Sequence, residues 1–245
     1  MRKDFKKLSV IIPVYNERET IAEVVETVLA VDIPLDLDVV VVDDGSTDGT
    51  LEELEFPSEV PVRIVRTEIN AGKGNAVRRG LTLAKGDLIL IQDADLELDP
   101  REYVALVDPI ISGRTHVVYG SRFLGNNDVP AIRRIGNQIL TGLTNLLYGT
   151  RLTDMETAYK AFTIDVAELL FLRSDRFDIE PEITAQIARL GLEIVEVPIT
   201  YRPRTKLEGK KIRWFDAIAA VWTLLKCRFS RDYSGRRRRA EFYRP

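Results

Sequence analysis

The chain has 245 residues, of which 45% are hydrophobic and 30% are charged, as expected of a soluble globular protein with a substantial core. Its apolar runs fall short of the roughly 18 to 20 residues that span a bilayer, and the run after the basic start lacks a signal-peptide cleavage site. A single cysteine, Cys227, excludes an internal disulfide and favours a reducing compartment. With a single histidine, His116, the chain offers too few ligands for a zinc site or a Cys/His nucleophile. We therefore expect a soluble or peripheral protein.

The net charge of −3 combines two parts of opposite sign. Residues 201–245 contain 14 Lys or Arg and 4 Asp or Glu, whereas the first 200 residues contain 21 Lys or Arg and 34 Asp or Glu. A basic end of this kind indicates an anionic partner, such as phosphate groups or an acidic membrane face. For the arginine run at 236–239 alone, a solvated tail is the simpler explanation.

Apolar runs alternate with segments of helical spacing through the first half of the chain. Strands are expected at 8–14, 37–43, 62–67, 88–92 and 117–121, and helices at 19–30, 48–54, 73–84 and 101–111. This alternation predicts an α/β fold, with a doubly wound, mostly parallel sheet and helices on both faces.

After residue 121 the pattern changes to helices at 132–147, 166–172, 182–190 and 212–229, a strand at 193–197 and a basic loop at 202–211. The last helix is apolar around most of its circumference, and basic residues flank it. Its two tryptophans, Trp214 and Trp222, suit a C-terminal amphipathic helix lying in an anionic membrane surface. A core or oligomer-packing helix is the alternative.

Two acidic clusters end apolar strands. Asp43 and Asp44 close the second expected strand, and Asp93 and Asp95 close the fourth. In an open parallel sheet, ligands bind at the carboxyl ends of the strands, so both clusters lie where a site would form. Mg²⁺ or Mn²⁺ is commonly held by one or two carboxylates together with substrate phosphates. The clusters therefore indicate a metal and a phosphorylated ligand, although aspartate at a turn also serves backbone hydrogen bonding.

The order and spacing of four segments resemble the nucleotide-sugar half of glycosyltransferase family 2, whose members have the GT-A fold. The segments are VIIPVYNE at 10–17, VDDGSTDGT at 42–50, NAGKGNA at 70–76 and QDAD at 92–95. The resemblance implies that Asp93 and Asp95 bind the metal and the diphosphate. It assigns the nucleotide sugar to Pro13, Tyr15, Glu17, Asp43, Asp44, Lys73, Asp93, Ala94, Asp95, Arg204 and Lys210. The Gly72-Lys73-Gly74 loop, whose glycines would let backbone approach the donor, is more similar to UDP-glucose users than to GDP-mannose users.

The second half is similar to the polyprenyl-phosphate hexose synthases. The similarity lies in Gly120-Ser121-Arg122-Phe123, in Arg133-Arg134 followed by Asn137, and in the basic loop at 204–211. It implies that Arg122, Arg133, Arg134 and Asn137 contact the phosphate of a lipid acceptor. We expect one GT-A domain at 1–229, with a nucleotide-sugar half (1–122), an acceptor half (123–211) and an interfacial helix (212–229), followed by a basic tail (230–245).

The resemblance implies an inverting, metal-dependent transfer of a hexose to a polyprenyl phosphate by a peripheral protein at the cytoplasmic membrane face. A phosphate acceptor already carries negative charge and needs no general base, whereas a hydroxyl acceptor does. The catalytic candidates are Asp93, Asp95, Arg122, Arg133 and Glu156. One alternative is a hydroxyl acceptor with Glu156, Asp178 or Glu180 as base, and another is a non-catalytic nucleotide-sugar-binding protein. No nucleic-acid partner is expected, and the sequence excludes neither GDP-mannose as donor nor a homo-oligomer.

Overall fold

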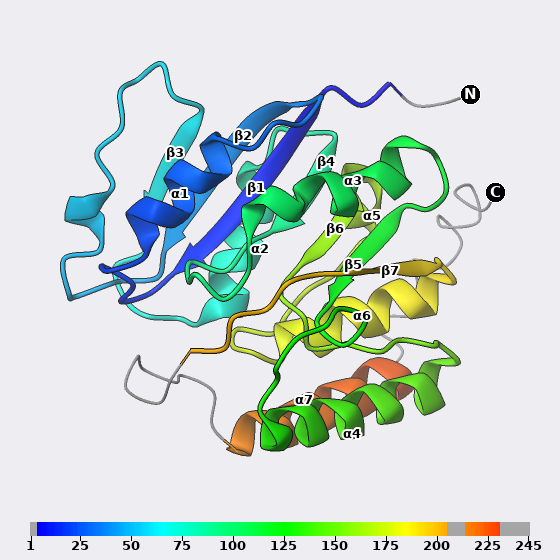
Figure 1. Cartoon of the computed structure of the whole chain (residues 1–245). Helices are drawn as coiled ribbons and strands as arrows, with labels where there is room; N and C mark the ends of the chain where they lie inside the picture. The colour runs from blue at the N-terminus through cyan, green and yellow to red at the C-terminus, as the bar shows by residue number, and fades with distance from the viewer. Residues whose placement is uncertain (1–3, 205–213, 231–245) are drawn as a thin grey trace.

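In the computed structural model, which describes residues 4–204 and 214–230, seven strands form one sheet in the order β3-β2-β1-β4-β6-β5-β7 (Figure 1). The strands are β1 (Lys7–Val14), β2 (Asp36–Asp43), β3 (Val62–Arg66), β4 (Leu88–Ile91), β5 (Val117–Ser121), β6 (Lys160–Thr163) and β7 (Ile194–Pro198). Strand β1 pairs in parallel with β2 and with β4, β2 pairs in parallel with β3, and β5 pairs in parallel with β7. The expected mostly parallel α/β sheet is confirmed.

Strand β6 lies antiparallel between β4 and β5 and was not among the expected strands. It has four residues, all of them buried, and the first is a lysine. A buried charge in so short a run obscures the apolar pattern that marks the other strands. The second half of the chain therefore completes the sheet as well as adding helices to it.

Helices cover both faces of the sheet. The helices α1 (Ile21–Leu29) and α3 (Tyr103–Ile111) pack on one face, in a core that includes Val10 and Ile12 of β1. The other face is covered by α2 (Lys73–Leu83), α5 (Ile164–Leu169) and α6 (Ile179–Leu190), in a core that includes Ile11 and Ile89. Successive side chains of a strand point to opposite faces, so the continuous apolar run of β1 serves both cores.

The helix expected at 48–54 is wrong, because only a short 3₁₀ turn forms there, at Leu51–Glu53. Gly49 has a φ of 93°, which an α-helix does not permit, and the Asp48 carboxylate accepts the N–H of Thr50 at 3.0 Å. The turn that Asp48 and Gly49 form therefore prevents an α-helix here, despite the helical spacing of the apolar residues. A second 3₁₀ turn, Pro100–Glu102, precedes α3.

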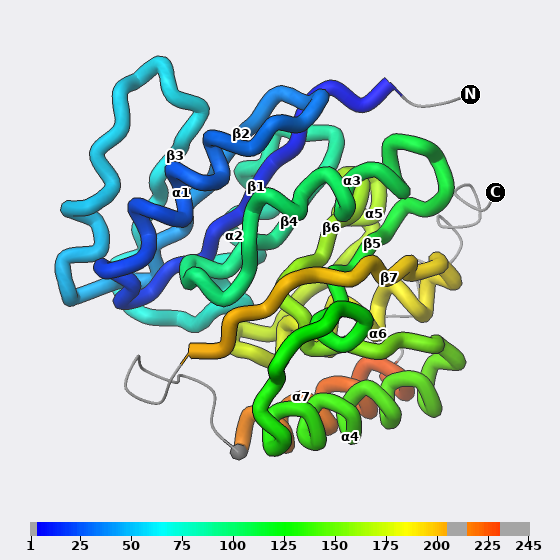
Figure 2. The backbone as a smooth tube through the Cα atoms, in the orientation of Figure 1, coloured from blue at the N-terminus to red at the C-terminus, as the bar shows by residue number. Residues whose placement is uncertain are grey.

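Two helices lie side by side beyond α6, on the side away from the sheet: α4 (Ala131–Tyr148) and α7 (Trp214–Phe229) (Figures 1 and 2). The inner face of α7, with Ala220, Leu224 and Cys227, packs in one apolar cluster with Leu140 of α4 and Ala185 of α6. The alternative that the last helix packs against the rest of the fold is therefore confirmed for its inner face. Among the described residues, every helix is too short or too polar to cross a membrane.

Candidate active site

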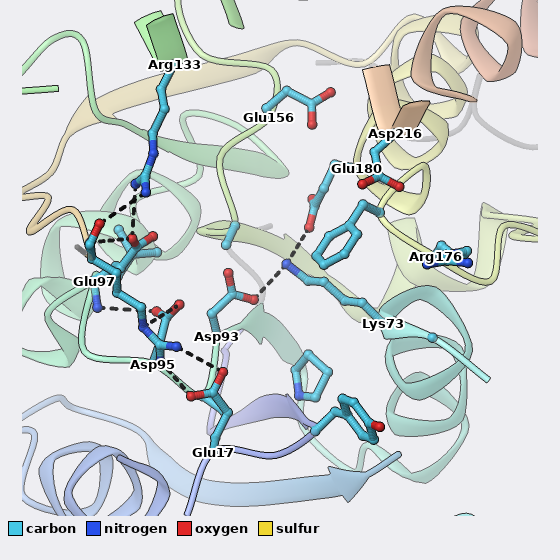
Figure 3. A pocket seen from close by; sticks show the side chains of 18 of the residues that line it. Glu17, Lys73, Asp93, Asp95, Glu97, Arg133, Glu156, Arg176, Glu180 and Asp216 are labelled. Carbon is cyan, nitrogen blue, oxygen red and sulfur yellow. Dashed lines mark hydrogen bonds and ion pairs between the residues drawn. The ribbon is translucent and has the colours of Figure 1, made fainter. Parts of the chain in front are cut away.

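The site forms where the chain changes direction across the sheet, at the carboxyl ends of β1 and β4. These strands are neighbours, and the chain leaves them in opposite directions along the sheet, from β1 toward β2 and from β4 toward β5, so a ligand-binding crevice is expected between their ends. A cavity of about 700 Å³ occupies this crevice (Figure 3). It brings together most of the predicted residues of both halves: Pro13, Tyr15, Glu17, Asp44, Lys73, Asp93, Ala94, Asp95, Arg122, Arg133, Asn137, Glu156 and Arg204.

Four carboxylates, from Glu17, Asp93, Asp95 and Glu97, meet on one wall of the cavity. Burial and the neighbouring charges of Asp93 and Glu97 raise the pKa of Asp95 to about 7. Such an excess of negative charge fits a divalent cation, which prefers oxygen ligands. Within residues 4–204 and 214–230, no group of three or more His, Cys, Asp or Glu side chains is arranged to hold a metal by itself. That Asp93 and Asp95 hold a metal together with oxygens of a bound diphosphate stays a prediction.

A buried chain of alternating charges leads from Asp93 into the protein (Figure 3). The Lys73 ammonium lies 2.6 Å from an Asp93 oxygen and 2.8 Å from a Glu180 oxygen. The other Glu180 oxygen lies 2.5 Å from the ammonium of Lys160 on β6. Burial opposes the charge of Glu180, but Lys160 and Lys73 hold its pKa below its ordinary value. Glu180 is therefore a fixed counter-ion for two lysines.

Of the three candidate bases, Glu156 is the one that faces the cavity without a partner. Its carboxyl points into the cavity (Figure 3), and its buried Oε1 accepts no hydrogen bond from the described residues. Burial raises the pKa of Glu156 to about 7. Asp178, by contrast, does not line the cavity, and its carboxylate accepts hydrogen bonds from Arg176 N–H and the Thr223 hydroxyl. Glu156 thus differs in environment from both Glu180 and Asp178.

Arg204 contacts three of the four carboxylates of this wall. Its guanidinium donates to both oxygens of Glu17, at 2.7 and 3.1 Å, and its Nε lies 3.5 Å from Asp95 Oδ2. Its backbone N–H donates to Glu97 at 2.7 Å. Arg204 therefore lies beside Asp95, and its contact with a donor diphosphate stays a prediction. Lys210, predicted for the same ligand, lies outside the described residues.

The two adjacent arginines of α4, Arg133 and Arg134, differ in whether they line the cavity. Arg133 lines the cavity and donates to Glu97 at 3.3 Å, to the Tyr201 hydroxyl at 2.7 Å and to the Arg204 carbonyl at 3.1 Å. Arg134 does not line the cavity, because consecutive helical residues point about 100° apart. Its guanidinium lies 5.4 Å from the centre of the Phe123 ring. The predicted contact of Arg134 with the acceptor therefore stays a prediction that the lining of this cavity does not support.

Arg122 and Asn137 line the cavity, but both already have a partner in Asp154. The Arg122 guanidinium makes two bonds of 2.7 Å to the Asp154 carboxylate, and the Asn137 amide donates to it at 2.5 Å. Burial opposes the charge of Asp154, but Arg122 keeps its pKa below the ordinary value. An ion pair inside the fold therefore describes Arg122 in this structure, and its contact with an acceptor phosphate stays a prediction.

The two aspartates at the end of β2 point in different directions. Asp44 lines the cavity, and its carboxylate accepts the N–H groups of Ala71 at 3.0 Å and Gly72 at 2.6 Å, which fixes the loop before α2. Asp43 does not line the cavity; its side chain is fully buried and accepts the Ser46 N–H at 3.1 Å. The predicted nucleoside contact of Asp43 is thus not offered directly to the cavity. We attribute this to the alternation of side chains along a strand.

The glycines of the Gly72-Lys73-Gly74 loop permit contact with another loop of the protein. Gly72 has a φ of 102°, and a Cβ atom there would clash with the Asp175 carbonyl. A Cβ atom at Gly74 would clash with the Ser174 carbonyl. The glycines therefore let the loop before α2 pack against residues 174–175, and their role in letting backbone approach the donor stays a prediction.

Sequence reasoning missed the side chains that hold the site in place. These are Glu97, Asp154, Lys160 and Tyr201. Their partners named above lie 17 to 107 residues away in the chain. No local pattern marks them, although the acidic character of Glu97, two residues after Asp95, is a signal that could have been used.

The strand order, with its crevice between β1 and β4 and a carboxylate pair at the end of β4, defines a GT-A fold. The family profile described as Glycosyl transferase family 2 matches residues 9–175. The chain belongs to this family.

Several known proteins are similar to the chain. A dolichol-phosphate mannosyltransferase of Pyrococcus furiosus is 33% identical over 230 residues, which cover 90% of this chain and 64% of that protein. An undecaprenyl-phosphate 4-deoxy-4-formamido-L-arabinose transferase of Photorhabdus laumondii is 26% identical, with 92% and 69% covered. The chain thus spans a little under two thirds of the Pyrococcus relative.

Among solved structures, glucosyl-3-phosphoglycerate synthase of Mycobacterium tuberculosis in complex with uridine diphosphate superposes with a TM-score of 0.70 at 22% identity. The match covers 91% of this chain and 80% of that one. At this identity the likeness supports the fold.

Proposed function

We propose that the protein is an inverting, metal-dependent hexosyltransferase that moves a hexose from a nucleotide diphosphate sugar to a polyprenyl phosphate. The names of the Pyrococcus and Photorhabdus relatives, which both include a polyprenyl phosphate, support the acceptor. UDP-glucose is the first donor to test, and GDP-mannose the second. The acceptor lipid would place the reaction at the membrane, and we propose its cytoplasmic face.

The observation that carries the choice of acceptor is the pairing of Glu180. Glu180, one of the three candidate bases, stands at the start of α6. Glu180 at this position is held by Lys73 and Lys160, so it is a poor proton acceptor. A phosphate monoester needs no base, because it is already an anion at neutral pH.

Asp93 and Asp95 would hold Mg²⁺ or Mn²⁺, which stabilises the negative charge of the leaving diphosphate when it is bound. Arg204 lies beside Asp95 and would bind the same phosphates. Arg133, from the α4 side of the cavity, and Arg122 are the candidates to orient the acceptor phosphate toward the sugar.

The role of the carboxylate pair is tested with Asp95→Ala. We expect the fold to survive and donor affinity in the presence of Mn²⁺ to fall on the order of tenfold or more. Isothermal titration calorimetry with UDP-glucose, with and without Mn²⁺, measures this. Asp108→Asn, on the exposed side of α3, is the matched control. Equal Mn²⁺-dependent affinity in Asp95→Ala and the control would contradict the metal assignment.

One observation favours a second candidate, a hydroxyl acceptor with Glu156 as the base. Its carboxyl faces the cavity without a hydrogen-bond donor among the described residues, and its pKa of about 7 suits a general base. Under this candidate Glu156→Gln should lose about 10² to 10⁴-fold in transfer rate. Under the phosphate candidate the same variant keeps its activity.

Product analysis decides between the two acceptors. The full chain is incubated with radiolabelled UDP-glucose or GDP-mannose, Mn²⁺ and either a short polyprenyl phosphate or the matching polyprenol. We expect label in a product of the phosphate and none in a product of the alcohol. Product from the alcohol alone, abolished by Glu156→Gln, would establish the second candidate instead.

A further inference from the structure

Helix α4 has a second apolar face that none of the described residues covers. Ile132, Ile135, Ile139 and Leu146 are exposed by 77%, 53%, 64% and 82%. Their spacing of three, four and seven residues places them along one stripe of the helix. The buried residues of α4, Leu140 and Thr144 among them, lie on the opposite side.

Helix α7 repeats this arrangement. Phe215, Ile218, Trp222 and Phe229 are exposed by 38%, 59%, 67% and 75%, and they follow the same spacing. They lie opposite the residues that bury the helix, such as Leu224. Both helices are therefore apolar on two sides, which packing inside this fold does not require.

The two stripes face the same side of the molecule. Helices α4 and α7 lie side by side, and their inner faces contribute to one cluster with α6 (Figures 1 and 2). Their outer stripes therefore point away from α6 together. We call this surface, made of the eight exposed residues named above, the outer face. Clustered exposed apolar residues of this kind indicate an interaction surface.

Charge distinguishes among possible partners of the outer face. Helix α4 contains no acidic residue, and the one acidic residue of α7, Asp216, is buried. Lys226, which is exposed, lies four residues after Trp222 on the same side of α7, and the exposed Arg228 follows near the end of the helix. An anionic surface complements these cations, whereas α4 and the described part of α7 offer no exposed carboxylate that would complement them in a second copy.

We propose that the outer face docks on an anionic lipid bilayer, an inference that rests on the proposed lipid acceptor. Trp222 and the aliphatic side chains enter the interface between headgroups and acyl chains, and Lys226 contacts lipid phosphates. Ile132 belongs to the outer face and also lines the cavity. Gly136 of α4 and Ala217 of α7, which are not part of the outer face, line the cavity as well. Docking thus turns an edge of the cavity toward the headgroup layer, where the phosphate of a membrane-embedded acceptor lies.

Flotation of the full chain with vesicles tests the proposal without donor or acceptor. Vesicles of phosphatidylcholine alone are compared with equal parts of phosphatidylcholine and phosphatidylglycerol. We expect binding to the anionic vesicles that weakens with salt and that falls on the order of tenfold in Ile139→Glu and in Trp222→Glu. Val104→Glu, at an exposed position of α3 on the other side of the molecule, should bind like the unaltered chain. Circular dichroism checks that each variant is folded.

Activity gives a second readout. Neither Ile139 nor Trp222 lines the cavity, so both variants should transfer normally to a short, water-soluble polyprenyl phosphate and poorly to an acceptor embedded in vesicles. Absence of transfer to either acceptor, with vesicle binding intact, would count against the proposed function and leave the docking face supported.

Two results would overturn the docking proposal. One is vesicle binding that is absent, or equal in Ile139→Glu, Trp222→Glu and Val104→Glu. The other is a dimer in sedimentation velocity that the first two substitutions convert to a monomer, which would assign the outer face to a second copy of this chain.

Discussion

Buried charged side chains in this protein hold other charged side chains in place through ion pairs. Glu180 joins Lys73, which contacts Asp93 on the carboxylate wall, to Lys160, which is fully buried on β6. Lys160 also donates to the carbonyls of Met155 and Thr157, on either side of Glu156. One glutamate therefore links the Asp93 side of the cavity to the segment that carries Glu156.

Glu180→Gln should lower the free energy of unfolding by about 3 to 5 kcal/mol, because it leaves the Lys160 ammonium buried without its counter-charge. Urea denaturation measures the change. Glu26→Gln, at an exposed position of α1, is the control and should change stability by less than about 0.5 kcal/mol. A double variant that adds Lys160→Met should regain much of the loss, since neither buried charge then remains. A loss as small as the control's would show that this pair does not stabilise the fold.

The raised pKa of Glu156 predicts a pH-dependent stability. Its folded-state pKa of about 7 lies above the ordinary value of 4.5, so the folded chain binds this proton more tightly than the unfolded chain does. The resulting stabilisation is complete below the ordinary pKa and is lost as pH rises through about 7. Glu156→Gln, which stays neutral, should therefore be more stable than the unaltered chain by about 1 to 3 kcal/mol at about pH 8. Chemical denaturation at about pH 5 and pH 8 checks the sign; an equal difference at both would refute it.

At the scale of elements, the loop before α2 depends on one backbone conformation. Gly72 has a φ of 102° and packs against the Asp175 carbonyl, and its N–H donates to Asp44. We expect Gly72→Ala to lower stability by at least about 1 to 2 kcal/mol, because an L-residue is strained there and its Cβ has no room. The displaced loop carries Lys73, so donor affinity should fall as well.

Gly142→Ala is the matched control for that prediction. Gly142 lies within α4, and a Cβ atom there meets nothing within 4 Å. Alanine should stabilise the helix by about 0.5 to 1 kcal/mol and leave donor affinity unchanged. Thermal denaturation and donor titration of both variants test the contrast. If Gly72→Ala behaved like Gly142→Ala, the loop would not need this conformation.

At the scale of the whole molecule, the two outer helices are joined to the GT-A sheet through the cluster around Leu224 and Cys227, both fully buried. The cavity is lined by residues of α4 and α7 as well as by strand ends, so its shape depends on this docking. The Tyr148 hydroxyl of α4 also donates to the Leu224 carbonyl of α7, at 2.6 Å.

Leu224→Ala should destabilise this docking by about 2 to 5 kcal/mol, the usual cost of a buried leucine. Cys227 is the single cysteine, so its reaction with a thiol reagent reports directly on the opening of α7. We expect the thiol of Leu224→Ala to react at least about tenfold faster than that of the unaltered chain. Ile218→Ala, at an exposed position of the same helix, should leave the rate unchanged. Equal thiol rates in both variants would mean that the packing of Leu224 does not hold α7 in place.

Local pattern was sufficient for much of the fold. Apolar runs and helical spacing identified six of the seven strands and every α-helix, apart from the segment at 48–54 that forms only a 3₁₀ turn. The position of Asp93 and Asp95 followed from the sequence as well. They directly follow a buried strand, and the carboxyl ends of parallel strands form the ligand-binding edge of the sheet.

The partners of the charged residues were decided by tertiary structure alone. Glu180 follows Lys73 by more than a hundred residues and Lys160 by twenty, and nothing in the spacing of these residues pairs them. In the same way Arg122 meets Asp154, and Arg134 turns away from the cavity that Arg133 lines. Periodicity records which face of an element is buried, because that depends on neighbours in the chain. The partner of a buried charge depends on which elements pack together, and packing is a property of the whole fold.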